Sequence, residues 1–419
     1  MKNPRIIGVI GLGYVGLPIA VSLSKHFKVI GFDIDSRRVD NLSKGVDDTN
    51  ELSISNKKEL KKVKLTNNKN DLKKVNFFII TVPTPIYKNK KPDLRNLISA
   101  SETVSKYLKK NDVIVYESTT YPGCTDNICI PILEKISKLK INKDFYCGYS
   151  PERINPGDKK HTLNKIAKII SGSNSTATQK IFQVYKNIIS KKLVKVKSIK
   201  IAEASKIIEN IQRDINIALM NELSKIFNKL KIDFSEVLKA SKTKWNFLNF
   251  SPGLVGGHCI GVDPYYLADL AKNNKIDSKI ILSGRKINDE MHNYISNKIH
   301  KSLKKNKKKS KIILFGLTFK ENIPDFRNSQ SIEIIEDLKK YNYQIDTFDP
   351  FVEKKFKGVS KHFVNFNNIK NNDYDLVIIA VSHKIFIEKG LLFFKKILNK
   401  NGKFFDLKNI FNNEADFKL

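Results

Sequence analysis

The sequence predicts an α/β protein with two Rossmann-like, doubly wound domains joined by a helical central region. Three observations support this fold class. Apolar, strand-like runs alternate with helix-like segments near the N-terminus, a pattern that is typical of a parallel sheet covered by helices. The C-terminal part repeats the same alternation. Between the two parts, residues 201–230 form one long segment with helical periodicity.

The N-terminal part begins with a strand–turn–helix–strand unit. "RIIGVIG" (5–11) predicts a buried strand, "YVGLPIAVSLSKHF" (14–27) a helix, and "KVIGFDID" (28–35) a second strand that ends in acid. Because glycines interrupt the apolar run, this unit explains the basic, apolar start better than a signal peptide does. Further strands are predicted in "VNFFIITVPTP" (75–85) and "DVIVYESTT" (112–120).

The middle and the end of the chain follow a related plan. The apolar positions of 201–230 cover too wide an arc for a surface helix, so we expect burial between domains or subunits, with more helix after Pro264. Near the C-terminus, "KIILFGLTF" (311–319) predicts a strand and "SIEIIEDLKKY" (331–341) a helix. Strands are also predicted in "QIDTFDP", which ends in acid, and in "YDLVIIAVS". The predicted domains are 1–198, 199–300 and 301–419, as the chain length of 419 residues allows.

The composition excludes several classes of protein. The net charge of +34 is compatible with nucleic-acid binding, but the lysines are spread over the whole chain, and the dense "KSLKKNKKKSK" (301–311) lies between two predicted domains. We therefore expect no specific nucleic-acid partner, although the positive field favours an anionic substrate or cofactor. No uninterrupted apolar run is long enough to predict a membrane span.

The four cysteines contain no CxxC pair, which predicts neither a metal site nor a disulfide framework. Together with the nucleotide-binding features below, this cysteine usage favours a reducing, cytoplasmic location.

"GLGYVG" (11–16) matches the dinucleotide-binding pattern GxGxxG. It follows a predicted strand and opens a predicted helix, and Asp33 ends the next strand, which makes the match specific. Gly11 permits the tight turn, Gly13 lets a pyrophosphate approach the backbone, and Gly16 lets the helix pack closely. Asp33 should accept hydrogen bonds from the adenosine ribose and repel a 2′-phosphate, so NAD is predicted rather than NADP.

Several separated motifs together resemble the UDP-glucose/GDP-mannose dehydrogenase family over nearly the whole chain. They are "GLGYVGLP", "TVPTP", "ESTTYPG", "SPERINPG", "EASKIIEN", "GGHCIGVDP" and "GLTFKENIPDFRNS". The resemblance implies oxidation of the C6 alcohol of a nucleotide sugar to a carboxylate, with two molecules of NAD and a covalent cysteine intermediate. It also implies a central dimerisation domain, hence a homodimer or higher homo-oligomer.

The resemblance assigns catalytic roles to residues whose chemistry suits this reaction. Cys259 would be the nucleophile that retains the aldehyde as a thiohemiacetal and then as a thioester, with Gly256 and Gly257 giving the substrate close access. Asp263 would take part in proton transfer. Lys206 and Asn210, four residues apart on one helix face, would stabilise the developing oxyanion.

Glu152 would be the general base for thioester hydrolysis, Thr119 would position the water, and Glu117 would support the cofactor side. Each residue also has an ordinary explanation, such as core filler for Cys259 or a helix cap for Glu152. Their joint occurrence in the family's order favours the catalytic roles. His258, adjacent to Cys259, is not expected to activate it, because neighbouring residues rarely face each other; a structural or substrate contact is expected instead.

The resemblance also implies binding residues. Those for the cofactor are Gly11, Gly13, Tyr14, Val15, Gly16, Asp33, Arg38, Thr84, Thr119 and Arg327. Those for the substrate are Glu152, Arg153, Lys206, Asn210, Trp245, Phe250, Gly256 and Lys320. Asp325 would orient Arg327 near a diphosphate.

"KWNFLNFSPGLVGGHCIGVDPYYLA" (244–268) resembles the branch of the family that acts on UDP-N-acetylhexosamines, UDP-GlcNAc or UDP-GalNAc, in bacterial surface polysaccharide synthesis. Ser251 departs from the bulkier, often basic residue expected before this glycine turn. The gluco and galacto substrates are not distinguished by the sequence.

Alternative functions remain open at this point. UDP-glucose or GDP-mannose could be the substrate. A two-electron dehydrogenase of the hydroxyacid type shares the glycine loop and a catalytic lysine, but it needs neither a nucleophilic cysteine nor a second Rossmann-like domain. A basic nucleic-acid-binding protein that retains a Rossmann scaffold is the non-enzymatic alternative.

Overall fold

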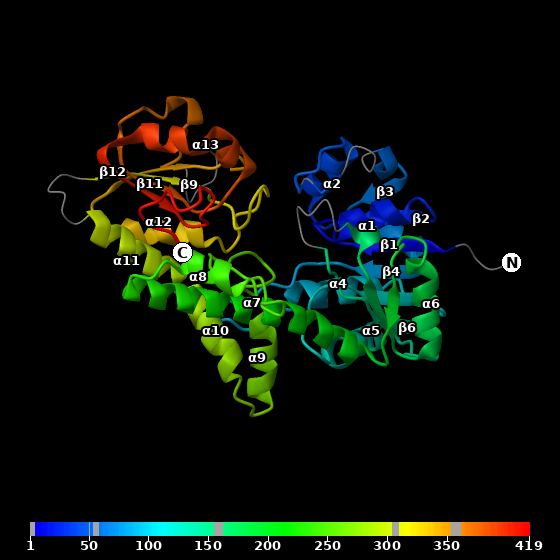
Figure 1. Ribbon diagram of the computed structural model, residues 1–419. Coiled ribbons are helices and arrows are strands. Elements are labelled where there is room, and N and C mark those ends of the chain that lie inside the picture. Colours follow the sequence, from blue (N-terminus) through cyan, green and yellow to red (C-terminus); the bar gives the residue numbers. More distant parts are fainter. Residues whose placement is uncertain (1–4, 50, 53–57, 155–161, 304–309, 353–361) are drawn as a thin grey trace. The chain divides into compact units, whose positions relative to one another are not determined.

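An eight-stranded sheet organises the N-terminal part of the computed structural model, and a four-stranded sheet organises the C-terminal part (Figure 1). The structure describes residues 5–49, 51–52, 58–154, 162–303, 310–352 and 362–419. The densest run of lysines, at 304–309, lies outside these residues. The chain divides into two units: Met1–Glu209 with Tyr265–Ile276, and Asn210–Pro264 with Asp277–Leu419.

The first sheet has the strand order β3-β2-β1-β4-β5-β6-β7-β8. Its strands are β1 (Ile6–Ile10), β2 (Lys28–Phe32), β3 (Val63–Thr66), β4 (Phe77–Ile80), β5 (Val113–Tyr116), β6 (Tyr146–Tyr149), β7 (Lys168–Gly172) and β8 (Leu193–Lys195). Neighbouring strands are parallel except β6 and β7, which pair antiparallel through only two residue pairs. The order of β3 to β6 is that of a dinucleotide-binding fold, in which ligands bind at the carboxyl ends of the strands.

Helices cover both faces of this sheet because side chains alternate along each strand (Figure 1). Ile7 and Val9 of β1 join one core, together with helices α1 (Gly16–Leu23) and α6 (Ser175–Tyr185). Ile10 joins the opposite core, with α4 (Arg95–Ser105) and α5 (Ile130–Ser137). The other helical elements of this part are α2 (Ser36–Ser43), a π-helical turn at Thr125–Cys129, and 3-10 turns at Lys69–Lys74 and Leu163–Lys165.

The second sheet is parallel with the order β10-β9-β11-β12. Its strands are β9 (Lys311–Phe315), β10 (Gln344–Phe348), β11 (Tyr374–Ile379) and β12 (Leu398–Asp406). Helices α11 (Met291–Leu303) and α12 (Gln330–Leu338) pack on one face, and α13 (Lys384–Ile397) packs on the other. A 3-10 turn lies at Phe366–Asn368. The predicted repeat of the N-terminal plan is therefore confirmed.

The predicted helical region is also confirmed. It comprises α7 (Ile199–Leu230), α8 (Phe234–Ser241), α9 (Asp263–Asn273) and α10 (Lys279–Asp289). Residues of α7 belong to the first unit up to Glu209 and to the second from Asn210. Among the described residues, no helix combines the length and the hydropathy needed to cross a bilayer.

Candidate active site

The glycine loop after β1 is tied to the acid that follows β2. Gly11 has a positive φ of 94°, and its N–H donates to the carbonyl oxygen of Phe32 at 2.8 Å. One carboxylate oxygen of Asp33 accepts the N–H of Leu12 at 2.7 Å, and the other accepts the N–H of Asp35 at 3.0 Å. Each oxygen keeps further lone pairs, so the carboxylate can also accept bonds from a ligand.

The other two glycines of the loop differ in their surroundings. A Cβ at Gly16 would overlap the carbonyl oxygen of Gly11 and the hydroxyl of Thr81, so α1 can start this close to the loop only with glycine there. A Cβ at Gly13 would meet no atom within 4 Å. The backbone at Gly13 therefore borders open space at the N-terminus of α1, which suits a pyrophosphate.

Loops after other strands meet the same edge of the sheet. The hydroxyl of Thr81, after β4, donates to the carbonyl oxygen of Gly11 at 2.8 Å. Thr84 donates to the carbonyl oxygen of Thr119 at 2.7 Å, which joins two of the predicted cofactor residues. Arg38 braces the loop by donating to the carbonyl oxygen of Leu12 at 3.0 Å. The carboxyl ends of β1, β2, β4 and β5 thus form one surface with Asp33 at its side.

A buried cluster of charged side chains lies beneath this edge, after β5 and β6. The ammonium of Lys168 is 2.6 Å from a carboxylate oxygen of Glu117 and 3.5 Å from one of Glu152. The hydroxyl of Tyr185 donates to the other oxygen of Glu117. Burial is the largest influence on Glu117 and raises its pKa to about 7, although Lys168 acts in the opposite direction.

The first half of α7 is anchored to the same unit by two carboxylates. Glu203 accepts the N–H of Gly123 at 2.5 Å and the N–H of Thr125 at 2.9 Å, and burial raises its pKa to about 7. Glu209 forms an ion pair with Arg153 at 2.8 Å. Lys206 lies between them on α7 and is buried. The predicted residue Arg153 is therefore held by α7, the helix that carries Lys206.

The cysteine turn belongs to the second unit. Cys259 is half-buried, and its carbonyl oxygen accepts the N–H of Asp263 at 2.8 Å, at the start of α9. The side-chain amide of Asn210 donates to the carboxylate of Asp263. The structure thus joins two predicted catalytic residues directly and places both beside the loop of the predicted nucleophile.

Buried amides hold the cysteine turn in place. Asn221 of α7 accepts the N–H of Gly253 at 2.8 Å and donates to the side chain of Asn288 at 2.8 Å. Gln330 donates to the carbonyl oxygen of Val255 at 2.9 Å. Beneath them, the buried guanidinium of Arg285 is 2.5 Å from Asp214.

Gly256 and Gly257 are explained by packing against another segment. A Cβ at Gly256 would lie 2.6 Å from the carbonyl oxygen of Asn328, and a Cβ at Gly257 would lie 2.6 Å from the ring of Phe319. Gly257 also has a positive φ of 84°. These glycines let segment 319–328 lie directly on the turn. The sequence had suggested only that they give the substrate close access.

Segment 319–328 carries the predicted cations Lys320 and Arg327. The guanidinium of Arg327 forms a double hydrogen bond with the buried carboxylate of Asp325, as expected, and lies 3.3 Å from the ring nitrogen of His258. The contacts of His258 also include the edge of the Phe319 ring. His258 therefore helps to hold this segment.

The loop after β9 repeats the geometry of the first loop. Gly316 has a positive φ of 91°, its N–H donates to the carbonyl oxygen of Phe348, and Asp349 accepts the N–H of Leu317 at 2.6 Å. In contrast with Asp33, this carboxylate is fully buried and also bonded to His383 at 3.0 Å. The carboxylate of Asp349 is therefore enclosed by groups of the C-terminal part, whereas Asp33 remains accessible to a ligand.

Two predicted substrate residues are not gathered into the turn. Trp245 is 91% exposed. Phe250 packs on a small core formed by Met220, Phe234 and Leu238. Within the described residues, no three His, Cys, Asp or Glu side chains are grouped so as to hold a metal ion.

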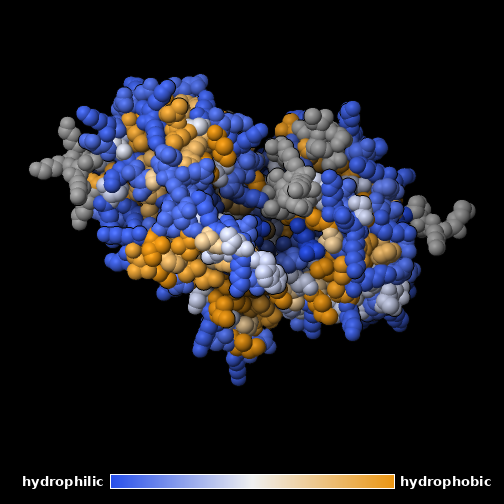
Figure 2. Space-filling view, viewed as in Figure 1, coloured by the Kyte–Doolittle hydropathy of each residue, from blue (hydrophilic) through white to orange (hydrophobic). Residues whose placement is uncertain are grey.

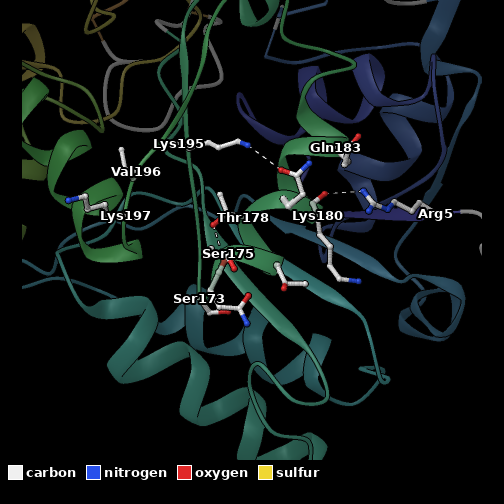
Figure 3. A pocket seen from close by; sticks show the side chains of 13 residues that line it. Arg5, Ser173, Ser175, Thr178, Lys180, Gln183, Lys195, Val196 and Lys197 are labelled. Atoms are coloured by element: carbon white, nitrogen blue, oxygen red, sulfur yellow. Dashed lines mark hydrogen bonds between the residues drawn. The ribbon is translucent and has the colours of Figure 1, made fainter.

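A basic cavity of about 800 Å³ lies at the far edge of the first sheet, by α6 and β8 (Figure 3). Arg5, Lys180, Lys195 and Lys197 line it. Arg5 donates to the carbonyl oxygen of Lys180, and Lys195 donates to Gln179. Two of the four cations in this cavity therefore already form hydrogen bonds within the protein. None of the residues singled out from the sequence lines this cavity.

Several site residues were not predicted from the sequence, namely Lys168, Tyr185, Glu203, Asp214, Asn221, Arg285, Asn288 and His383. A signal existed for α7, because polar residues recur at helical spacing among its buried positions: Glu203, Lys206, Asp214, Asn221 and Ser224. Lys168 and Tyr185 gave no such signal, since each is a single residue whose partner, Glu117, lies far away in the sequence.

Comparisons with known proteins agree with this architecture. Three models of the UDP-glucose/GDP-mannose dehydrogenase family match: the NAD binding domain at 5–189, the central domain at 200–290 and the UDP binding domain at 313–413. The chain is 49% identical to the UDP-N-acetyl-D-glucosamine 6-dehydrogenase of Salmonella typhi, covering 92% of this chain and 91% of that protein. It is 46% identical to the enzyme of that name from Pseudomonas aeruginosa, with 100% of both chains covered.

Among solved structures, a UDP-D-ManNAc dehydrogenase from Pyrococcus horikoshii superposes with a TM-score of 0.86 at 28% identity, over 99% of this chain and 98% of that one. The sheets, the glycine loop and the matches over all three domain models lead to one assignment. The chain belongs to the UDP-glucose/GDP-mannose dehydrogenase family and is an NAD-dependent nucleotide-sugar dehydrogenase.

Proposed function

We propose that the enzyme oxidises the C6 hydroxyl of a UDP-N-acetylhexosamine, UDP-GlcNAc or UDP-GalNAc, to the uronic acid for bacterial surface polysaccharide synthesis. The observation that carries this proposal is the turn of Cys259, in which Asn210 holds Asp263 beside the predicted nucleophile. The choice of substrate is supported by the relatives named UDP-N-acetyl-D-glucosamine 6-dehydrogenases, at 49% and 46% identity.

The overall reaction converts one alcohol, one water and two NAD⁺ into a carboxylate, two NADH and three protons. Bound NAD supplies the hydride acceptor in both oxidations. The residues of the first loop suit it, because Gly13 borders open space and Asp33 keeps lone pairs for ribose hydroxyls. Gly11, Tyr14, Val15, Gly16, Arg38, Thr84, Thr119 and Arg327 complete the proposed cofactor set.

Cys259 retains the aldehyde between the two oxidations. Its thiolate adds to the aldehyde carbon and gives a thiohemiacetal, which becomes a thioester when the second hydride leaves. Lys206 stabilises the negative oxygen. Asp263, oriented by Asn210, takes part in the transfer of the alcohol proton through a water molecule. Glu152 then removes a proton from the water that cleaves the thioester, with Thr119 positioning that water.

The proposed substrate contacts are Glu152, Arg153, Lys206, Asn210, Trp245, Phe250, Gly256 and Lys320. Arg153 and Lys320 offer cationic groups to the diphosphate or to the developing acid. Phe250 and Trp245 lie on the segment after α8.

The test is an assay of NADH formation with UDP-GlcNAc, UDP-GalNAc, UDP-ManNAc, UDP-glucose and GDP-mannose. UDP-ManNAc belongs in the panel because similar solved structures are named UDP-ManNAc dehydrogenases. We expect the highest kcat/KM with UDP-GlcNAc or UDP-GalNAc. A preference for UDP-glucose or GDP-mannose would refute the substrate assignment.

We also propose a homodimer or higher homo-oligomer. Apolar side chains are exposed along α7, at Ile208, Leu219, Ile226 and Leu230, and on α10, where Ile280 is 71% exposed. Figure 2 shows apolar surface gathered over the helices of the central region. Water-exposed stripes of this kind are usually covered by another chain. Light scattering should give at least twice the mass of 48.0 kDa, and Leu219→Glu with Ile226→Glu should lower it.

We further propose the domain boundaries 1–198, 199–300 and 301–419 and a cytoplasmic location. A reducing compartment suits an enzyme whose nucleophile is a free thiol. Helix α11 (Met291–Leu303) spans the second boundary, so limited proteolysis should cut near residue 198 and after Leu303. Fractionation should recover the enzyme with cytoplasmic markers.

A further inference from the structure

The ammonium of Lys168 lies between two carboxylates in the interior of the first unit. Lys168 is the first residue of β7 and is 2% exposed at its side chain. Its ammonium lies 2.6 Å from Glu117, 3.5 Å from Glu152 and 3.3 Å from the carbonyl oxygen of Pro151. A lysine is seldom buried unless it is paired, so the arrangement depends on both acids.

Glu117 and Tyr185 fix the position of the ammonium. The hydroxyl of Tyr185 donates to one oxygen of Glu117, and Lys168 donates to the other. The ammonium also lies 5.5 Å from the centre of the Tyr185 ring. Both residues are held by regular secondary structure: Glu117 directly follows β5, and Tyr185 is the last residue of α6.

Glu152 is held by different groups at its two oxygens. One oxygen accepts the N–H of Arg153 at 2.7 Å and the N–H of Ile154 at 2.5 Å. The other faces Lys168. Two backbone donors and one ammonium therefore fix the orientation of this carboxylate.

The cluster has one more carboxylate than it has ammonium groups, and this couples the two acids. Two carboxylates and one ammonium carry a net charge of −1, so near neutral pH the cluster can take up one proton. Burial raises the pKa of Glu117 to about 7, and the pKa of Lys168 is raised by the two carboxylates, which outweigh its burial. Glu117 is therefore the acid of this cluster that takes up the proton.

We propose that Lys168 is a positioning residue for the base of thioester hydrolysis: fixed by Glu117 and Tyr185, it orients the carboxylate of Glu152. The inference rests on the proposed function, in which Glu152 is that base. In the step concerned, a water oxygen bonds to the thioester carbon, its proton passes to Glu152, and the C–S bond breaks. The electron pair of that bond returns to Cys259 as a thiolate, and the product is the carboxylic acid.

The test compares Lys168→Met and Glu117→Gln with Lys195→Met, a control that removes an exposed lysine from β8, an edge strand of the same sheet. Lys168→Met should keep a rapid burst of two NADH per active site and slow the later turnover about 10- to 100-fold at pH 7. The thioester on Cys259 should accumulate and be visible in the intact mass. Lys195→Met should behave as the wild type.

The pH profile separates positioning from a general loss of structure. The charged groups that face Glu152 are Lys168, Glu117, Tyr185 and the neighbouring Arg153, whose guanidinium pairs with Glu209. Lys168 acts against burial and lowers the pKa of Glu117, so without this cation the acidic limb of kcat that follows Glu117 should move up by about one pH unit. Glu117→Gln has no proton to take up and should lack this limb.

A limb that moves up in Lys168→Met and is absent in Glu117→Gln would support the positioning role. Equal losses of burst and turnover, or unchanged pH limbs, would overturn it while leaving the proposed function intact if the wild type still forms two NADH. Absence of NADH from the wild type would instead overturn the proposed function. If Lys168→Met does not fold, Glu117→Gln and Tyr185→Phe decide by the same two readouts.

Discussion

Replacing Asp33 by Asn should weaken the preference of the enzyme for NAD over NADP. Both oxygens of Asp33 accept backbone N–H groups of the loop, at 2.7 and 3.0 Å, and their remaining lone pairs serve the ribose. Losing a charged acceptor costs about 1.5–3 kcal/mol for NAD. For NADP, removing a charge about 4 Å from a phosphate relieves roughly 1 kcal/mol for each charge pair in water. The kcat/KM ratio of NAD to NADP should therefore fall by about a hundredfold or more.

The assay is initial-rate NADH and NADPH formation at saturating sugar nucleotide. Asp35→Asn is the matched control, because Asp35 carries the same charge two residues away but is exposed and caps α2 through the N–H of Arg37. Its ratio should stay within about twofold of the wild type, since a surface charge acts weakly through water. An unchanged ratio in Asp33→Asn, or an equal change in Asp35→Asn, would refute the role of Asp33.

Three further tests address other parts of the structure. Gly13→Ala should fold normally but raise KM for NAD, whereas Gly16→Ala should lower the melting temperature, because a Cβ has room only at Gly13; equal effects would contradict this. Asp214→Asn leaves the buried Arg285 with less countercharge, at a cost of about 3 kcal/mol, or roughly 6–12 °C of melting temperature, while Asp277→Asn in an exposed pair should change little. Asp233→Ala removes the N-cap of α8 and should cost about 1 kcal/mol at pH 7. Lys418 and Ser235, acting against burial, lower the pKa of Asp233 to about 2, so this cost should shrink as pH falls from 4 to 2; a constant cost would contradict the cap.

The fold could be predicted because its elements carry strong local patterns. The buried strand at 6–10, the glycine loop and Asp33 occur in the order that a dinucleotide-binding unit requires, and the same order recurs at Gly316 and Asp349. The antiparallel pairing of β6 with β7 could not be predicted, because only two residue pairs join the strands. Nothing in the sequence of either strand specifies its direction.

The candidate site was predictable where neighbours in sequence act together. Asp325 and Arg327 are two residues apart, and Cys259 and Asp263 lie within one turn, so their contacts follow from local geometry. The pairing of Lys168 with Glu117 joins residues 51 positions apart, and only the register of the sheet brings them together. Likewise, the bond of Asn210 to Asp263 spans 53 positions.

In the proposed mechanism, one active site performs two oxidations in succession and holds the aldehyde on Cys259 between them. The decisive measurement is the number of NADH formed for each molecule of UDP-GlcNAc or UDP-GalNAc consumed, with Cys259→Ser measured in parallel. We expect two NADH for each uronic acid in the wild type and a loss of complete turnover in Cys259→Ser with substrate binding retained. One NADH for each sugar nucleotide, with free aldehyde as the product, or full turnover in Cys259→Ser, would contradict it.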